Sequence, residues 1–298
     1  MKCTIFIPTK NSGNQFNEVL KQISIQKEDF ELIIVDSGST DHTLEIINNW
    51  IQKIPIKLYQ IKSSEFGHGK TRNLSLKYAK GEFIIFLSQD AIPLNNLWLT
   101  NLIRNFNENN MAASFSRQIP KKNASITEIY FCKENYPNKQ ILRPLNKNNT
   151  LENIFFSNVS SCIRKDILKE FPFNENIIMS EDQEWTKRII ENGYKTIYEP
   201  KSIVIHSHNY NLKQTFKRYF DSALSLTQIF DRFNNFTKKG SRYMRREFAY
   251  ILKKAPLKIP YLLPYNLTKI LATTLGINHE RIPKNTKKKL SMHKYYWN

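Results

Sequence analysis

Short apolar runs alternate with segments of helical periodicity along the first 95 residues of the chain. Four runs have the length and composition of buried strands, and they lie at residues 4–7, 31–35, 56–61 and 83–87. The segments between them, such as residues 14–25 and 72–79, carry apolar side chains three or four positions apart. This alternation predicts an α/β fold with a mostly parallel sheet and helices on both of its faces.

The remaining pattern predicts further elements and then a change of character. Helices are expected over residues 96–106 and 181–192, the second ending at Gly193, and a last strand is expected over residues 203–205. The polar residues 118–150 are expected to be mobile. From residue 212 onward the pattern is that of amphipathic helices, interrupted by Pro256, Pro260 and Pro264. We therefore expect a first domain over residues 1–210 and a helical extension over residues 211–298.

Polar residues gather where three of the predicted strands end. Pro8, Thr9 and Lys10 follow the first strand, Asp36 follows the second, and Ser88, Gln89 and Asp90 follow the fourth. Ligands of parallel α/β sheets bind at the carboxyl ends of the strands, so these residues indicate one shared nucleotide-type site. Ordinary turn formation would explain Gly38 and Ser39, but not an aspartate after an apolar strand in two places.

The charge of the chain is strongly uneven. The 45 Lys and Arg residues outnumber the 26 Asp and Glu residues, which gives a net charge of +19. Residues 1–209 hold 26 basic and 22 acidic residues, a balance of +4, whereas residues 210–298 hold 19 and 4, a balance of +15. The extension is expected to meet an anionic partner, either nucleic acid or a membrane surface, with a merely solvated basic face as the alternative.

Composition excludes several classes of protein. With 40% hydrophobic residues and only 8 glycines, the chain is neither disordered nor fibrous. Its three cysteines, Cys3, Cys132 and Cys162, show no C-x-x-C spacing, which argues against a disulfide framework or a structural zinc site and favours a reducing cytoplasm. The sequence shows no secretion signal and no run of ~18 apolar residues, so a spanning helix is not expected.

Five motifs follow one another in a characteristic order. They lie at residues 7–10 (I-P-T-K), 35–41 (V-D-S-G-S-T-D), 66–73 (F-G-H-G-K-T-R-N), 88–91 (S-Q-D-A) and 181–182 (E-D). In this combination the chain resembles family 2 glycosyltransferases of the GT-A fold. Together with residues 290–297 (L-S-M-H-K-Y-Y-W), it is similar to the bacterial rhamnosyltransferase branch of that family. The resemblance covers nearly the whole chain and is weakest over residues 110–150.

The resemblance implies a site for a nucleotide-diphosphate sugar. The family places the equivalent of Asp36 near the base, although this residue could instead cap the following turn. Gly67 and Gly69 leave room for a diphosphate beside the start of a helix, where anions are favoured and the Arg72 fork suits phosphate. The expected donor-binding residues are Pro8, Thr9, Asp36, His68, Gly69, Arg72, Gln89 and Asp90.

A divalent cation is also implied. Asp90 stands where the family has the last Asp of a D-x-D motif, but Ser88 occupies the first position. One carboxylate can still serve Mg²⁺ or Mn²⁺, because water and diphosphate oxygens complete the coordination. The family also supplies a histidine from the last strand exit, for which His206 is the first candidate and His208 the second. The alternative to metal ligation is that the two histidines form an exposed pair in a loop.

The general base is expected at the start of a helix. In the resembling family the second residue of the E-D pair removes the proton of the acceptor hydroxyl, which assigns that role to Asp182 and a supporting role to Glu181. Acidic residues are favoured at helix starts in any case, which is the competing explanation. Trp185 could line an acceptor pocket, although a core position is the more ordinary place for a tryptophan.

These expectations combine into one function. An inverting enzyme would move L-rhamnose from dTDP-rhamnose to an O-antigen or capsule acceptor carried on polyprenyl diphosphate, at the cytoplasmic face of the inner membrane. The basic extension would supply a peripheral membrane contact. Alternatives are transfer from UDP-hexose or UDP-N-acetylhexosamine, or a catalytically silent nucleotide-sugar-binding module. A nucleic-acid-binding protein is disfavoured because no helix-turn-helix, zinc-finger or RNA-binding aromatic signature accompanies the charge.

Overall fold

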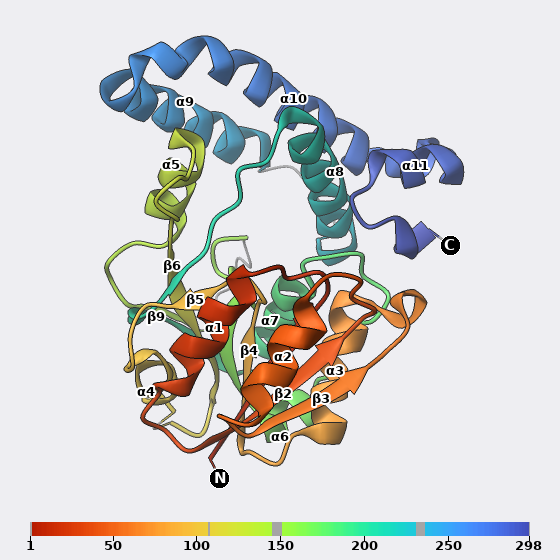
Figure 1. Ribbon diagram of the computed structural model, residues 1–298. Coiled ribbons are helices and arrows are strands. Elements are labelled where there is room, and N and C mark those ends of the chain that lie inside the picture. The colour runs from red at the N-terminus through yellow and green to blue at the C-terminus, as the bar shows by residue number, and fades with distance from the viewer. Residues whose placement is uncertain (1, 107, 145–150, 231–235, 298) are drawn as a thin grey trace. The chain divides into compact units, whose positions relative to one another are not determined.

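The structure is a computed structural model that describes residues 2–106, 108–144, 151–230 and 236–297. Contacts divide the chain into two compact units. The first comprises residues 1–119, 136–176 and 181–206, and the second comprises residues 120–135, 177–180 and 207–298. Figure 1 labels helices and strands of both units where there is room.

The first unit is built on the parallel strands predicted from the amino-terminal pattern. Their order is β3-β2-β1-β4, formed by β1 (Cys3–Thr9), β2 (Phe30–Asp36), β3 (Ile56–Gln60) and β4 (Phe83–Leu87). The register sets Thr9 opposite Asp36, so the ends of β1 and β2 lie level with each other. The connections run through α1 (Gln15–Ser24), α2 (Thr43–Ile51), the short η1 (Ser63–Glu65) and α3 (His68–Tyr78).

The sheet continues beyond β4 with mixed strand directions. Strand β8 (Ser160–Arg164) runs antiparallel to both β4 and β6 (Met111–Ile119), and β6 is parallel to β9 (Lys195–Ile205). Strands β5 (Ile92–Pro93) and β7 (Ile141–Arg143) pair antiparallel with β9. The helices of this half are α4 (Trp98–Ile103), α6 (Lys165–Glu170) and α7 (Glu181–Glu191). The expected mixed α/β class is confirmed.

Both faces of the sheet are apolar. Alternate residues of β1, Cys3, Ile5 and Ile7, join one buried cluster with side chains of α1, α2 and α4, and Figure 1 shows α1 and α2 side by side over the strands. Phe6 points to the other face, where it meets Phe86 edge to face with ring centroids 5.9 Å apart. Burial of both faces explains why these strands appear in the sequence as continuous apolar runs.

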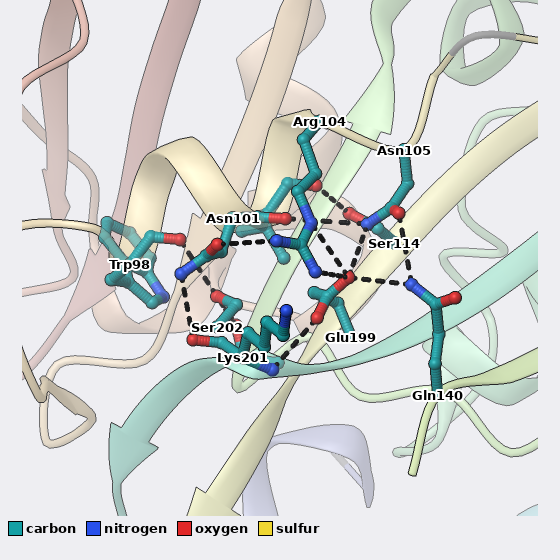
Figure 2. Close-up of polar contacts among 11 residues, drawn as sticks. Trp98, Asn101, Arg104, Asn105, Ser114, Gln140, Glu199, Lys201 and Ser202 are labelled. Carbon is teal, nitrogen blue, oxygen red and sulfur yellow. Dashed lines mark hydrogen bonds and ion pairs between the residues drawn. The ribbon is translucent and has the colours of Figure 1, made fainter.

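Strand β9 is irregular near its end, and a buried carboxylate holds the irregularity in place. The register with β6 jumps between Ser116 and Arg117, so that Glu199 is paired with the first and Ile203 with the second. Glu199 accepts hydrogen bonds from four donors, shown in Figure 2, which are Arg104 Nε, Asn105 Nδ2, Gln140 Nε2 and the Lys201 backbone N–H. Burial alone would raise the pKa of Glu199, yet hydrogen bonds from Asn105, the Lys201 N–H and Arg104 lower it. The bulge redirects the last residues of β9, which lead to His206.

The second unit is helical among the residues described. Its helices are α5 (Ile126–Asn135), α8 (Leu212–Ile229), α9 (Phe236–Lys254), α10 (Ile259–Ile277) and α11 (Lys284–Leu290), with short turns η2 (Pro256–Lys258), η3 (His279–Arg281) and η4 (Lys294–Trp297). Helices α8 and α10 approach closely at Gly276, where a Cβ would lie 2.5 Å from the Phe220 carbonyl oxygen. In the described part of the chain, no helix has the length and apolarity needed to cross a membrane.

Three local expectations were wrong. Residues 118–150 are not simply a polar stretch, because they contain the end of β6, α5 and β7; residues 145–150 lie outside the described part. Helix α3 begins at His68, four residues before the expected start, because Gly67 is already at its amino-terminal cap. The strand expected at residues 203–205 is the end of the longer β9. Gly193 ends α7 as expected, with φ of +87°.

Candidate active site

The loops after β1 and β2 interlock at the carboxyl edge of the sheet. Asp36 is fully buried, and its Oδ2 accepts hydrogen bonds from the backbone N–H groups of Gly38 and Ser39, both at 3.0 Å. The Ser39 hydroxyl also donates to Asp36 Oδ1. From the other loop, Asn11 Oδ1 accepts the Thr40 N–H at 2.8 Å. Asp36 therefore shapes the β2 loop directly, in addition to any contact with a ligand.

Gln89 joins the end of β4 to the end of β1. Its Oε1 accepts hydrogen bonds from the Thr9 hydroxyl at 2.9 Å and the Lys10 N–H at 2.7 Å, while its Nε2 donates to the Lys10 carbonyl at 3.1 Å. Pro8 precedes this junction as a half-buried residue of β1. Three of the predicted donor-binding positions are thus brought together by hydrogen bonds or chain continuity.

The start of α3 carries a buried arginine. Arg72 lies 3.0 Å from Glu181 Oε1 as an ion pair, and its Nη1 donates to the His68 carbonyl at 3.3 Å. Gly69 has a reason of its own to lack a side chain, because a Cβ there would lie 2.5 Å from the Asn174 carbonyl oxygen. The close approach at Gly69 is therefore to the chain itself, which the sequence did not suggest.

Asp182 occupies the first turn of α7, where backbone donors hold its carboxylate. Its Oδ2 accepts the Asn158 N–H at 3.0 Å and its Oδ1 accepts its neighbour's N–H, that of Gln183, at 2.9 Å. Burial, together with the charge of the adjacent Glu181, raises the pKa of Asp182 to about 7. A carboxyl group with such a pKa can take up a proton near neutral pH, which is what a general base requires.

Asp90 and His206 meet at the other end of the site. Asp90 Oδ1 lies 3.5 Å from His206 Nε2, and His206 is 8% exposed. The other ring nitrogen, Nδ1, lies 2.9 Å from Gln118 Oε1. Gln118 turns this oxygen toward the ring because its Nε2 donates to Tyr136 Oη at 2.6 Å and to Ser157 Oγ at 2.9 Å. With Gln118 Oε1 as the acceptor, Nδ1 is the ring nitrogen that donates to Gln118, and Nε2 lies on the Asp90 side.

This arrangement fits a divalent cation. A carboxylate oxygen beside the lone pair of an imidazole, whose second nitrogen is held by a hydrogen bond, has the form of a metal-ligating pair. His208 comes two residues after His206, where the second unit begins, and stacks on Tyr210 with ring centroids 5.0 Å apart. Together Asp90, His206 and His208 supply the ligand types that a metal ion needs.

Two adjacent residues connect the Asp90 side of the site to the Asp182 side. Ser157 accepts the hydrogen bond that orients Gln118, and the next residue, Asn158, donates its backbone N–H to Asp182. Asn158 also donates from Nδ2 to Glu181 Oε1 at 3.3 Å. The segment before β8 thus holds both halves of the site within one hydrogen-bonded network.

Sequence reasoning missed Gln118 and Asn158 as well as the pairing of Arg72 with Glu181. Asn158 has polar neighbours in residues 157–161 (S-N-V-S-S), and this polar run is the signal that could have drawn attention to it. The core reading of Trp185 is confirmed, since its side chain is fully buried and its Nε1 donates to the Phe171 carbonyl at 2.6 Å.

Comparison with known proteins identifies the family of the chain. Residues 4–171 match the family described as glycosyl transferase family 2. The whole chain is 34% identical to the O-antigen chain rhamnosyltransferase RfbN of Salmonella typhimurium and covers 96% of it. It is equally similar, at 34% identity over 99% of this chain and 95% of the relative, to the O-antigen chain rhamnosyltransferase WbaN of Salmonella anatum.

Solved structures agree on the fold. The mannosyltransferase PcManGT of Pyrobaculum calidifontis, in complex with GDP-Man and Mn²⁺, superposes with a TM-score of 0.60 at 17% identity, covering 93% of this chain and 73% of that one. Staphylococcus aureus TarS in complex with UDP gives a TM-score of 0.56 at 20% identity, covering 94% and 91%. The fold is therefore the expected GT-A fold, and the chain belongs to glycosyltransferase family 2.

Proposed function

We propose that this glycosyltransferase moves L-rhamnose from dTDP-L-rhamnose onto a hydroxyl group of a growing bacterial surface polysaccharide. The observation that carries the proposal is the full-length likeness to two O-antigen chain rhamnosyltransferases, because it extends beyond the family's common motifs to the carboxyl end. Residues 1–210 would form the transferase domain and residues 211–298 an extension that meets the membrane.

Asp182 is the proposed general base. The acceptor oxygen attacks the anomeric carbon from the face opposite the diphosphate, and its proton passes to Asp182. The bond between the anomeric carbon and the phosphate oxygen breaks, and its electron pair leaves with the dTDP product, so the configuration inverts. The buried Glu181, paired with Arg72, supports the base by raising the pKa of Asp182. This raised pKa, together with the backbone N–H donors on the carboxylate, supports the assignment.

Asp90 and His206 are the proposed ligands of a Mg²⁺ or Mn²⁺ ion, with His208 as a third. When bound, the cation would neutralise negative charge on the diphosphate leaving group. The residues themselves contribute an oriented carboxylate and an imidazole whose tautomer Gln118 selects. The mannosyltransferase PcManGT, which shares the fold, is in complex with Mn²⁺, and this supports the proposal of a divalent cation here.

The donor would lie along the carboxyl ends of β1, β2 and β4. Asp36 would face the base, while Pro8, Thr9 and Gln89 line the junction of two strand ends. His68, Gly69 and Arg72 would lie toward the diphosphate, where Arg72 offers positive charge. Arg72 Nε is buried and makes no hydrogen bond to another described residue, so a phosphate oxygen that reached it would satisfy a donor that has no partner in the described chain.

A peripheral membrane contact would bring the enzyme to a polyprenyl-diphosphate-linked acceptor at the inner face of the cytoplasmic membrane. Helix α10 supports this, because its outward side is apolar. Leu263, Leu267, Ile270 and Leu271 lie on one side of the helix and are each about half exposed or more. Leu257, in the turn Pro256–Lys258 just before the helix, is 93% exposed. An apolar strip on a surface usually marks an interaction site.

Charge favours a lipid surface as the partner of this strip. Residues 248–279 contain no Asp or Glu, and Lys253, Lys254 and Lys258 flank Leu257. Apolar side chains bordered by lysines are typical of a helix that lies in the interface of an anionic leaflet.

The donor assignment is tested by binding. The purified protein with Mn²⁺ would be titrated calorimetrically with dTDP-rhamnose, UDP-glucose, UDP-N-acetylglucosamine and GDP-mannose. The proposal expects dTDP-rhamnose to bind most tightly and to undergo slow hydrolysis that Asp182→Asn abolishes. Tighter binding of a UDP-sugar than of dTDP-rhamnose would show that the proposed donor is wrong. Binding without hydrolysis or transfer from any donor would favour a silent binding module.

A further inference from the structure

The carboxyl-terminal residues 290–297 are anchored to α8 by a buried carboxylate. Asp221 is fully buried, and its Oδ2 accepts the backbone N–H groups of Met292 at 2.8 Å and His293 at 3.2 Å. Ser291 is also fully buried. A buried carboxylate is costly unless it is hydrogen-bonded, so this anchor defines where the segment lies on the helix.

The same helix holds a second, distant segment, residues 177–180. Ile178 is 1% exposed and belongs to one apolar cluster with Phe220 and Leu224 of α8 and with Trp297, the last described residue. Met179 packs against this cluster, and its sulfur accepts a hydrogen bond from the Ser222 hydroxyl at 3.5 Å. Residues 177–180 and the carboxyl-terminal segment therefore share one core.

Backbone strain lies where this segment ends. Ser180 has φ of +63°, in the left-handed region that a residue with a side chain rarely adopts. Such a conformation costs free energy and persists only where the surrounding structure holds it. The next residue along the chain is Glu181, the first residue of α7, and Asp182 follows it.

We propose that residues 290–297 position the Glu181–Asp182 pair by holding residues 177–180 on α8. Trp297 acts here as a positioning residue, because it packs in the same cluster as Ile178. Ser180, in its left-handed conformation, then connects the held segment directly to the first turn of α7. The inference rests on the proposed role of Asp182. It also assigns a role to the L-S-M-H-K-Y-Y-W motif, which has no role in the proposed donor and metal sites.

The effect on catalysis follows from the hydrogen bond between the Asn158 N–H and Asp182 Oδ2. If residues 177–180 loosen, the first turn of α7 loses its fixed start and this bond lengthens or breaks. A displacement of about 1 Å at a catalytic group can cost about 100-fold in rate. Donor binding should not change, because the strand ends that would hold the nucleotide are separate from this cluster in the sequence.

The test compares Trp297→Ala with wild-type protein by amide hydrogen exchange of the full-length chain. We expect faster exchange in residues 177–184 and at the Asn158 amide, with unchanged exchange in β1 and β2. Trp297→Phe should restore protection, and Lys294→Ala, which alters an exposed side chain of the same segment, should have no effect. Unchanged exchange of residues 177–184 in Trp297→Ala would overturn the inference. Because exchange needs no substrate, this result stands apart from the identity of the donor.

Kinetics supply the second readout. Trp297→Ala should lower kcat at least tenfold while the dissociation constant of dTDP stays within twofold of wild type, and Trp297→Phe should recover most of kcat. A wild-type kcat in folded Trp297→Ala would contradict the inference. Should that variant fail to fold, Met179→Ala decides by the same two measurements, since it loosens the segment from within.

Discussion

Asp182 combines a shielded position with an unusually high proton affinity. Its pKa is raised to about 7 by burial and by the neighbouring Glu181 charge, so the carboxylate form, which accepts a proton, predominates only above neutral pH. The rate of transfer should therefore rise with pH up to about 7 and level off above it. A pH–rate profile at saturating donor checks this, and a rate that is flat from pH 5 to 8 would show that another group is the base.

Replacing the Asp182 carboxyl group by an amide removes proton acceptance while keeping the shape of the side chain. Asp182→Asn should lower kcat by about 10²–10⁴-fold, because an amide does not accept the acceptor proton, and should leave dTDP affinity unchanged. Rapid-mixing measurement of product formation with calorimetric titration of dTDP gives both quantities. Asp166→Asn, which alters an exposed carboxylate of α6, is the matched control and should behave like wild type.

Gln118 is the residue that should set metal affinity without being a ligand. In Gln118→Leu the Nδ1 proton of His206 loses its acceptor, and we expect Mn²⁺ to bind the dTDP complex about 10–100-fold more weakly. Gln118→Glu retains an acceptor oxygen and should bind Mn²⁺ at least as tightly as wild type. Calorimetric Mn²⁺ titration distinguishes the two, and equal affinity of Gln118→Leu and wild type would remove Gln118 from the metal site.

At the scale of elements, the bulge of β9 depends on Glu199. Glu199→Gln weakens bonds to four donors, and we expect the free energy of unfolding to fall by about 1–3 kcal/mol. Since the pKa of Glu199 is lowered in the folded state, its contribution is fully present above its ordinary pKa of 4.5 and is lost as pH falls through the folded value. Urea unfolding at pH 7 measures the loss. Glu191→Gln, which removes an exposed pair with Lys187, should cost less than about 1 kcal/mol.

Local sequence pattern predicts the elements that are recognisable from their own residues, without their tertiary contacts. Strands β1, β2 and β4 are buried on both faces, so their apolar runs stand out, and Gly193 marks the end of α7. Helix α5 was not recognised because its apolar residues are distributed around the helix and do not form one stripe. Strand β7 has only three residues, and it is recognisable only from its pairing with β9.

The candidate site likewise has residues that the sequence indicates and contacts that only the structure reveals. Asp90, His206 and Asp182 were predicted from their motifs and from their positions at the ends of strands. Arg72 with Glu181 and Gln118 with His206 are pairs of residues that lie far apart in the sequence, so no local pattern predicts that they pair. Sequence therefore indicates candidate residues for the chemistry, whereas the contacts among them emerge from the fold.

At the scale of the whole molecule, the concentration of positive charge in residues 210–298 accompanies the apolar outward side of α10. We expect co-sedimentation with vesicles containing phosphatidylglycerol at low salt and release as salt rises, because each lysine near an anionic leaflet is worth about 1 kcal/mol and screening shortens its reach. Leu267→Glu should abolish binding, whereas Ile25→Glu, at an exposed apolar position of the first unit, should not.

Two outcomes would contradict the membrane contact. One is equal binding to neutral and anionic vesicles, or binding to neither at low salt. The other is a concentration-dependent dimer, seen by analytical ultracentrifugation, that Leu267→Glu dissociates, since the strip would then belong to a second copy of the chain. Neither outcome affects the assignment to the glycosyltransferase family.

The most direct test of the account is the transfer reaction itself. The full-length protein, Mn²⁺ and dTDP-L-rhamnose would be incubated with synthetic polyprenyl-diphosphate-linked saccharides, and the products analysed by mass spectrometry and by NMR of the new anomeric centre. The account predicts the addition of one deoxyhexose with inverted configuration in wild type and none in Asp182→Asn. Transfer from a UDP-sugar in preference to dTDP-rhamnose, or a retained anomeric configuration, would contradict it.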